Sequence, residues 1–313
     1  MTRAFVFPGQ GSQAVGMGTA LAEAFGAARH VLEEVDDALG ERLSRLMHDG
    51  PEADLTLTAN AQPAIMAVSV AVARALEAEL GGPLMARGAF VAGHSLGEWS
   101  ALVAASALPL ADAARLLRLR GQAMQEAVPP GAGAMTALLG VEVAVAAAIA
   151  AEAAAGEVCA VANANTPGQV VLSGTAAAIE RAEALAPAKG AKRCVRLTVS
   201  APFHCALMAP AAERVAAALE TRAIATPAVP VVANVTAQPV DQPSAIRRLL
   251  VEQVTATVRW CESMMRLKAE GVDTIVELGE GKVLFGMVRR IDRDLTPLAV
   301  GTPAEVESFL KTL

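Results

Sequence analysis

The stretch that decides the fold of this chain is Val91-Ala92-Gly93-His94-Ser95-Leu96-Gly97-Glu98-Trp99-Ser100. Residues 88–92 form a short apolar run that is typical of a buried strand, and the Ala- and Leu-rich run 96–107 predicts a helix. Between them, Gly93-x-Ser95-x-Gly97 matches the nucleophile elbow, a tight strand-to-helix turn that lifts a serine oxygen above the sheet edge. We therefore interpret Ser95 as a nucleophile. The alternative is a serine that caps a helix beside a packing glycine.

Composition sets the class of protein. Of the 313 residues, 54% are hydrophobic and 19% are charged, as in a globular chain long enough for one or two domains. The formal net charge of −6 argues against a general nucleic-acid-binding protein, which usually carries a basic excess. No uncharged apolar run reaches the roughly 18 residues that a bilayer span requires, so we expect no membrane association.

The four cysteines are scattered, with no C-x-x-C pair. This spacing predicts neither a disulfide framework nor a zinc site, and we expect no bound metal. Free cysteines are typical of a reducing compartment, which makes a cytoplasmic location the expected one. The strand-like segment Arg3–Phe7 starts at once, so no signal peptide is expected.

Two α/β patterns share the chain. The outer segments alternate strand and helix, as a mostly parallel sheet requires; the strands that we expect there are 3–7, 88–92, 231–235, 273–278 and 298–300. A Pro- and Gly-rich linker leads into residues 131–197, whose expected order is β-α-β-β-α-β, the ferredoxin-like pattern. We therefore predict an α/β protein in which residues 1–130 and 198–313 form a large domain and residues 131–197 an inserted small domain.

Arg120 lies on the apolar side of a predicted helix, residues 110–127. It follows Leu116 and Leu117 by four and three positions, so it shares their face. A guanidinium group buried there is costly unless an anion meets it. Two interpretations stay open: a structural salt bridge with an internal Asp or Glu, or bidentate binding of a substrate carboxylate.

His204 is the candidate general base. The chain has four histidines, and His30 and His48 lie on polar helices where we expect them to be solvated. His94 is adjacent to Ser95, so its side chain should point away from that serine. His204 follows a proline turn and is the remaining partner for Ser95. The alternative is a loop histidine that makes only a structural hydrogen bond.

Five separated motifs together resemble the malonyl-CoA:acyl-carrier-protein transacylase family of bacterial fatty-acid synthesis. They span essentially the whole chain, and their order and spacing are far more specific than any one of them. The motifs are Phe7-Pro8-Gly9-Gln10-Gly11-Ser12-Gln13, Gly93-His94-Ser95-Leu96-Gly97-Glu98, Arg120-Gly121-x-x-Met124, Ser200-x-Pro202-Phe203-His204, and Gln253 followed by Val258-Arg259-Trp260. The resemblance implies an α/β-hydrolase-like large domain with a ferredoxin-like insert.

The resemblance also implies chemical roles. Ser95 would be acylated as the nucleophile, and His204 would be its general base. Arg120 would bind the free carboxylate of malonate. The backbone N–H groups of Gln10 and Leu96 would form the oxyanion hole.

Three further residues enter the implied site. The backbone carbonyl of Gln253 would orient His204 in place of the usual triad acid. Phe203 should crowd an α-methyl branch and favour malonyl over methylmalonyl, a preference worth only about 1–3 kcal/mol for one methyl group. Cys205 stands where serine is frequent in the family, and it would either make the site sensitive to thiol reagents or be buried and inert.

The implied reaction is a ping-pong transfer of malonyl from malonyl-CoA, through malonyl-serine, to the phosphopantetheine thiol of acyl carrier protein, without a cofactor. Because the carrier protein in this pathway is acidic, a basic rim is expected near the cleft, and plain solvated charges are an equal alternative. The candidates for this rim are Lys189, Lys192, Arg193, Arg289 and Arg290. We expect a monomer.

Other functions share parts of these motifs. A serine esterase or thioesterase has the elbow, but it needs no Arg120 and usually supplies an acidic third residue. A malonyl transferase of a malonate decarboxylase or polyketide system shares nearly every motif. A non-catalytic scaffold for carrier protein would need none of Ser95, His204 and Arg120.

Overall fold

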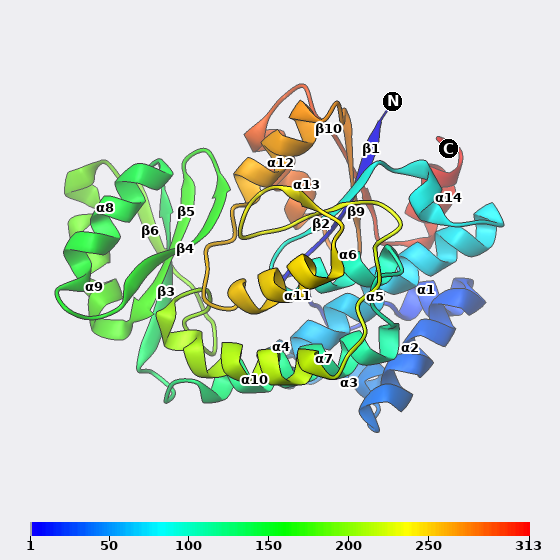
Figure 1. Cartoon of the computed structure of the whole chain (residues 1–313), viewed down its shortest axis with the longest axis horizontal. Helices are drawn as coiled ribbons and strands as arrows, with labels where there is room; N and C mark the ends of the chain where they lie inside the picture. Colours follow the sequence, from blue (N-terminus) through cyan, green and yellow to red (C-terminus); the bar gives the residue numbers. More distant parts are fainter. Residues whose placement is uncertain (1) are drawn as a thin grey trace.

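Two β-sheets organise the chain in this computed structural model, which describes residues 2–313 (Figure 1). The first sheet has the order β10-β9-β1-β2-β7-β8, and its strands are parallel except for the last pair, β7 and β8. Its strands are β1 (Arg3–Phe7), β2 (Phe90–Gly93), β7 (Val231–Val232), β8 (Pro239–Val240), β9 (Thr274–Leu278) and β10 (Thr296–Val300).

Strand β1 is apolar at every position after Arg3 because helices cover both faces of this sheet. Phe5 and Phe7 point into one core layer with α5 and α6, whereas Ala4 and Val6 point into a second layer with α12 and α13. Figure 1 places the blue and cyan helices on one side of the sheet and the orange helices on the other. The helices of this part are α1 (Thr19–Ala24), α2 (Gly26–Leu39), α3 (Leu43–Asp49), α4 (Glu52–Thr56), α5 (Thr58–Leu80), α6 (Gly97–Ala104), α7 (Leu110–Glu126), α10 (Ala209–Glu220), α11 (Pro243–Glu252), α12 (Trp260–Ala269), α13 (Val283–Ile291) and α14 (Pro303–Leu310).

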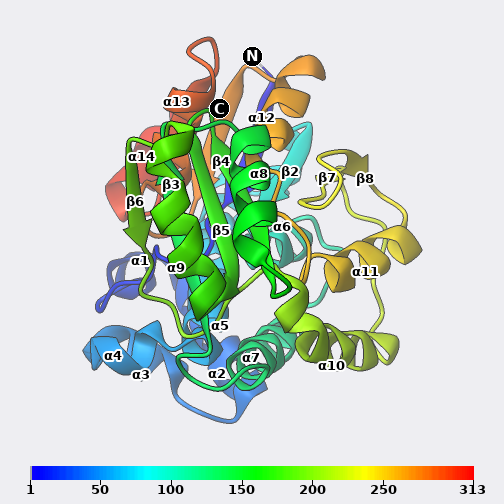
Figure 2. The ribbon, with the colours of Figure 1, turned by 90° about the vertical axis from the view of Figure 1, so that its left-hand side faces the viewer.

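The second sheet has the order β4-β5-β3-β6 and is antiparallel throughout. Its elements follow one another as β3 (Gly133–Leu139), α8 (Val143–Ala154), β4 (Cys159–Thr166), β5 (Gln169–Thr175), α9 (Ala176–Leu185) and β6 (Arg193–Arg196). Both helices pack on one face, which Figure 2 presents to the viewer. The opposite face turns toward the helices of the first sheet, and at the outer edge of β4 the backbone of Val258 bonds to Ala162 and Ala164 at 2.9 Å each.

The observed elements follow the sequence pattern closely, with differences at several ends. The helix after the central turn runs only from Gly97 to Ala104, because residues 105–108 form a turn that returns the chain toward α7. Helix α11 starts at Pro243, not Ile246, since proline is well suited to the first helical turn. The expected strand 231–235 ends at Val232, and β8 was not expected at all.

Among the described residues, no helix is both long and apolar enough to cross a membrane.

Candidate active site

The turn around Ser95 lies at the carboxyl end of β2, next to the loop that leaves β1. Ser95 has a φ of 53°, a left-handed conformation that is strained for a residue with a side chain. The flanking glycines permit the turn: a Cβ on Gly93 would lie 1.9 Å from the backbone of Gly97, and one on Gly97 would lie 2.2 Å from the Phe7 carbonyl oxygen. The strand-turn-helix geometry of a nucleophile elbow is therefore built as the motif predicts.

Ser95 and His204 are in hydrogen-bond contact. The distance from Ser95 Oγ to His204 Nε2 is 2.8 Å, and His204 Nδ1 lies 2.8 Å from the backbone carbonyl oxygen of Gln253. Because a carbonyl only accepts, Nδ1 carries the proton and Nε2 is free to accept from Ser95. His204 also has a positive φ of 57°, so a strained backbone holds each member of the pair.

His204 is buried, and this burial lowers its pKa to about 3, with the positive charge of Arg120 adding to the effect. The imidazole is therefore neutral over the ordinary pH range, which is the form that accepts a proton. The side chain of His94 turns elsewhere, to Asn165 Oδ1 at 2.8 Å, as we expected. His30 and His48 are exposed, also as expected.

Arg120 is fully buried on α7 and points at the serine. Its Nη1 donates to Gln62 Oε1 at 2.7 Å, and its Nη2 donates to Gln253 Oε1 at 3.0 Å and to Ser95 Oγ at 3.2 Å. No carboxylate of the described residues lies within 4.0 Å of the guanidinium, so the structural salt bridge is absent. Burial lowers the pKa of Arg120 to about 10, against the opposing effect of the Glu98 carboxyl group, and the groups that accept its hydrogen bonds are neutral.

A cavity of about 280 Å³ opens above Ser95, and it lies between the two sheets. Gln10 and Leu96 both line it. Within residues 2–313, neither of their backbone N–H groups has a hydrogen-bond acceptor. The side chains around them include Gln62, Arg120, Met124, Met135, Asn163 and Phe203. The cavity thus combines a serine hydroxyl bonded to a neutral imidazole, free backbone donors and a buried cation.

Known proteins resemble this chain over nearly its whole length. The acyl transferase domain model matches residues 4–294. The malonyl CoA-acyl carrier protein transacylases of Bacillus subtilis strain 168 and Escherichia coli K12 are 45% and 44% identical, covering 99% and 98% of this chain and 96% and 98% of their own length. The crystal structure of acyl-carrier-protein-S-malonyltransferase from Bartonella henselae has a TM-score of 0.97 at 53% identity, covering 100% of this chain and 99% of that one.

The chain belongs to the malonyl-CoA:acyl-carrier-protein transacylase family.

One further solved relative bears on partners. It is a malonyl-transacylase in complex with a type II polyketide acyl-carrier protein, with a TM-score of 0.96 and 42% identity, covering 100% of both chains. The solved relatives confirm the mixed α/β class that the sequence predicts for this chain.

Sequence reasoning missed Asn234, which follows the two-residue strand β7. Its Oδ1 accepts from the backbone N–H of Ser95 at 2.8 Å, and its Nδ2 donates to the Gly93 carbonyl at 2.7 Å. One side-chain amide thus bridges the Gly93 carbonyl and the Ser95 N–H in the elbow of this transacylase. An Asn directly after an apolar run was the only signal in the sequence, and the contact joins residues 139 positions apart.

The side chain of Thr58 connects the loops of the site. Its Oγ1 lies 3.1 Å from Gln10 Nε2 and 2.9 Å from Ser200 Oγ. It is the first residue of α5, and Gln62, which holds Arg120, is one turn further on. The start of α5 therefore positions both the loop that carries Gln10 and the guanidinium of Arg120.

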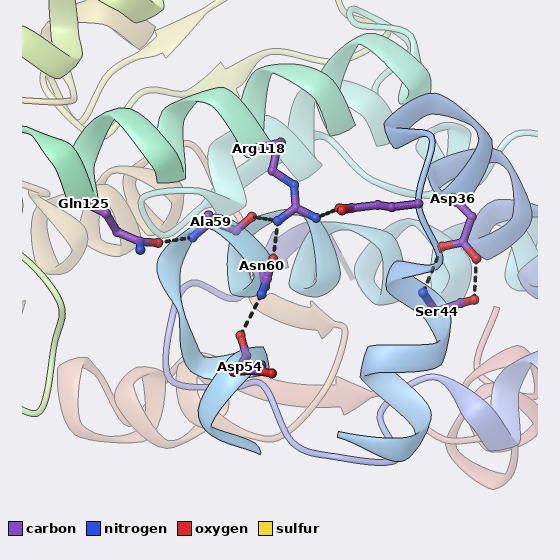
Figure 3. Close-up of polar contacts among 8 residues, drawn as sticks. Asp36, Ser44, Asp54, Ala59, Asn60, Arg118 and Gln125 are labelled. Atoms are coloured by element: carbon purple, nitrogen blue, oxygen red, sulfur yellow. Dashed lines mark hydrogen bonds and ion pairs between the residues drawn. The ribbon is translucent and has the colours of Figure 1, made fainter. Parts of the chain in front are cut away.

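Helix α7 clamps this start of α5 through a second set of side chains (Figure 3). Arg118 Nη1 donates to the Ala59 carbonyl at 2.7 Å and to Asn60 Oδ1, and Arg118 also pairs with Glu41. Gln125 Oε1 accepts from the Ala59 N–H at 2.6 Å. In Figure 3 the side chains of Arg118 and Gln125 lie along one side of α7.

Cys205 is buried beside His204, and its Sγ contacts the Pro202 carbonyl oxygen at 3.2 Å. Burial raises the pKa of this thiol, which favours the unreactive thiol over the thiolate. No group of three or more potential metal ligands gathers in the described part of the chain.

The candidate basic residues are exposed, and two of them have neighbours. Lys189 pairs with Glu152 at 2.6 Å, and the guanidinium of Arg289 lies over the Phe285 ring at 5.8 Å from its centroid. Lys192, Arg193 and Arg290 extend into solvent.

Proposed function

We propose that this chain is an [acyl-carrier-protein] S-malonyltransferase, which moves the malonyl group from malonyl-CoA to the phosphopantetheine thiol of acyl carrier protein. The observation that carries this proposal is the buried Arg120 cation, which lies 3.2 Å from the nucleophile oxygen and, among the described residues, has no carboxylate within 4.0 Å. A site of this kind is completed by an acyl group that ends in its own carboxylate.

The reaction begins with proton transfer from Ser95 Oγ to Nε2 of His204 as the serine attacks the thioester carbonyl carbon. Nδ1–H stays on the Gln253 carbonyl and keeps the imidazole in the accepting tautomer. The thioester C–S bond then breaks, and the proton on Nε2 passes to the coenzyme A thiolate. The carrier-protein thiol takes the malonyl group from Ser95 by the reverse of these steps.

Negative charge that develops on the carbonyl oxygen is proposed to rest on the N–H groups of Gln10 and Leu96. Both line the cavity without an internal acceptor, and a preorganised donor of this kind is worth about 3–4 kcal/mol in acyl transfer. Leu96 immediately precedes α6, so the positive end of the helix dipole adds to the effect.

Phe203 is proposed to narrow the acyl pocket. It lines the cavity beside His204 and is almost fully buried, so a methyl branch at the α-carbon would press against its ring. Malonyl is therefore preferred over methylmalonyl by the modest factor that one methyl group allows. Ser95, His204, Arg120 and the backbone donors act directly on the two substrates. This set of groups suffices for the chemistry, so we propose no cofactor and no metal.

The architecture is proposed to be an α/β-hydrolase-like large domain, residues 1–130 and 198–313, with a ferredoxin-like insert at 131–197. The order β4-β5-β3-β6 with both helices on one face supports the second part. A monomer in the cytoplasm, with acyl carrier protein bound at a basic rim, completes the proposal. Lys192, Arg193 and Arg290 are the exposed charges best suited to that rim.

Transfer to carrier protein tests the proposed function. The protein is mixed with malonyl-CoA and purified phosphopantetheinylated carrier protein of fatty-acid and of polyketide type, and the products are followed by mass spectrometry. Malonyl-carrier protein should form with little free malonate. Release of free malonate without transfer would instead identify a hydrolase, and transfer only to the polyketide carrier would favour the context of the solved complex.

A further inference from the structure

Glu98 is a buried carboxyl group beside the site, yet it does not line the cavity. It lies in the first turn of α6, three residues after Ser95, and is 3% exposed. Burial raises its pKa to about 7, against the opposing effects of its hydrogen bonds and of Arg120. Such a group costs stability where an apolar side chain would not, so its contacts matter.

Two hydrogen bonds reach the Glu98 side chain, and both end on the same oxygen. Its Oε2 accepts from the backbone N–H of Asn234 at 2.9 Å and from Gln253 Nε2 at 2.9 Å. A single acceptor atom therefore joins the two residues that hold the nucleophile turn and the base, which come from different parts of the chain.

Asn234 and Gln253 carry this contact on to the reacting groups. Asn234 Oδ1 accepts from the Ser95 N–H, and Gln253 Nε2 donates to the Ser95 carbonyl at 3.0 Å. The Gln253 carbonyl fixes Nδ1 of His204. The strained φ angles of Ser95 and His204 persist only while such neighbours hold them.

We infer that Glu98 is a positioning residue for acylation: the Oε2 atom, as a hydrogen-bond acceptor, orients Asn234 and Gln253, and through them Ser95 and His204. The inference rests on the proposed acyl transfer and adds a residue to it. The acceptor works in both protonation states, because the carbonyl oxygen of a neutral carboxyl group accepts as well. It acts on the nucleophile and the base, so it serves malonyl and acetyl donors alike.

Three variants separate the acceptor from the charge. Glu98→Gln keeps an oxygen at the same distance along the side chain and removes the charge. Glu98→Asp keeps the charge and withdraws the oxygen by one methylene. Glu98→Met fills the space and removes the acceptor. Glu277→Gln is the matched control, because Glu277 is also buried and accepts two backbone N–H groups, those of Leu284 and Phe285, outside the site.

The rate of self-acylation is measured by rapid quench and intact-protein mass, with saturating malonyl-CoA and separately with acetyl-CoA. We expect Glu98→Gln to stay within about three-fold of the wild type. Glu98→Asp and Glu98→Met should lose about 10- to 100-fold with both donors, as one to two unsatisfied hydrogen bonds imply, with KM for malonyl-CoA little changed. Glu277→Gln should keep the wild-type rate whatever its melting temperature.

Several outcomes would overturn the inference. Wild-type acylation rates in Glu98→Asp and Glu98→Met would show that Glu98 has no positioning role. A loss of rate in Glu98→Gln alone would show that the charge matters and not the acceptor. A loss with malonyl-CoA only would place the effect on Arg120. If Glu98→Met does not fold, the Gln and Asp pair decides. A wild-type protein that forms no malonyl adduct would overturn the proposed function and this inference with it.

Discussion

Arg120 is the residue on which the proposed choice of acyl group depends. Its two terminal nitrogens reach Gln62, Gln253 and Ser95, so the planar fork is already oriented before a substrate enters. Lysine would keep the charge and lose the fork.

Replacing Arg120 by lysine should therefore lower kcat/KM for malonyl-CoA by about 30- to 100-fold, the loss of roughly 2–3 kcal/mol in charge-assisted hydrogen bonds. Acetyl-CoA has no carboxylate, so its kcat/KM should change by less than about three-fold. Steady-state rates with both donors measure this. An equal fall with the two donors would show that Arg120 serves Ser95 and not the substrate.

The depressed pKa of His204 gives a second expectation at this scale. Burial and the charge of Arg120 hold that pKa near 3, so the base is neutral well below pH 6.5. We expect kcat/KM for acylation by acetyl-CoA, a donor without its own carboxylate, to stay level from pH 8 down to about pH 5. A fall centred near pH 6.5 would contradict the buried, neutral base.

At the scale of elements, the β2–turn–α6 unit depends on the absence of two side chains. Gly97 packs against the backbone that leaves β1, and any Cβ there meets the Phe7 carbonyl oxygen at 2.2 Å. The strand, the turn and the helix cannot move apart without displacing Ser95.

The Gly97→Ala variant should lose roughly 3 kcal/mol or more of unfolding free energy, depending on how far the turn yields. It should form no acyl-enzyme on Ser95. Gly286→Ala is the control, since its Cβ meets nothing within 4 Å and the residue lies inside α13. That change should stabilise by about 0.5–1 kcal/mol through helix propensity. Chemical denaturation measures both, and a stable, active Gly97→Ala would contradict the close approach.

The sequence carried most of the information about these elements and less about the contacts between them. Apolar runs and helical periodicity predicted nearly all strands and helices, and the spacing of Leu116, Leu117 and Arg120 predicted a buried guanidinium. The contacts of Asn234 and Glu98 were not predicted, because a single polar residue follows no periodic pattern. Their contacts join residues 136 to 155 positions apart, which only the folded sheet brings together. The catalytic and binding roles assigned to the site residues all stay predictions: Ser95, His204, Arg120, Gln253, Gln10, Leu96 and Phe203.

At the scale of the whole molecule, two buried carboxyl groups make stability depend on pH. Burial raises the pKa values of Glu98 and Glu277 to about 7, above the ordinary value of 4.5. The unfolded chain then releases these protons at lower pH than the folded chain does. The stabilising contribution of these two raised pKa values to the free energy of unfolding is complete below about pH 4.5. It is lost as the pH rises through 7.

Glu277→Gln should therefore flatten the fall in unfolding free energy between pH 4.5 and pH 7, while Glu98 still contributes its part. Denaturant titrations at several pH values measure the slope for both proteins. The variant loses one acceptor at the start of α13, so its absolute stability will be lower at acid pH. Parallel slopes in variant and wild type would show that Glu277 titrates normally in the folded chain.

The central claim is a malonyl-enzyme formed on Ser95 and selected by Arg120, and the intact-protein mass after brief mixing with malonyl-CoA tests it most directly. We predict one malonyl adduct in the wild type, none in Ser95→Ala, and much less malonyl adduct in Arg120→Ala. With acetyl-CoA, the wild type should form only a little acetyl adduct. An adduct that persists in Ser95→Ala, or a wild type that forms none and does not turn over, would contradict the account.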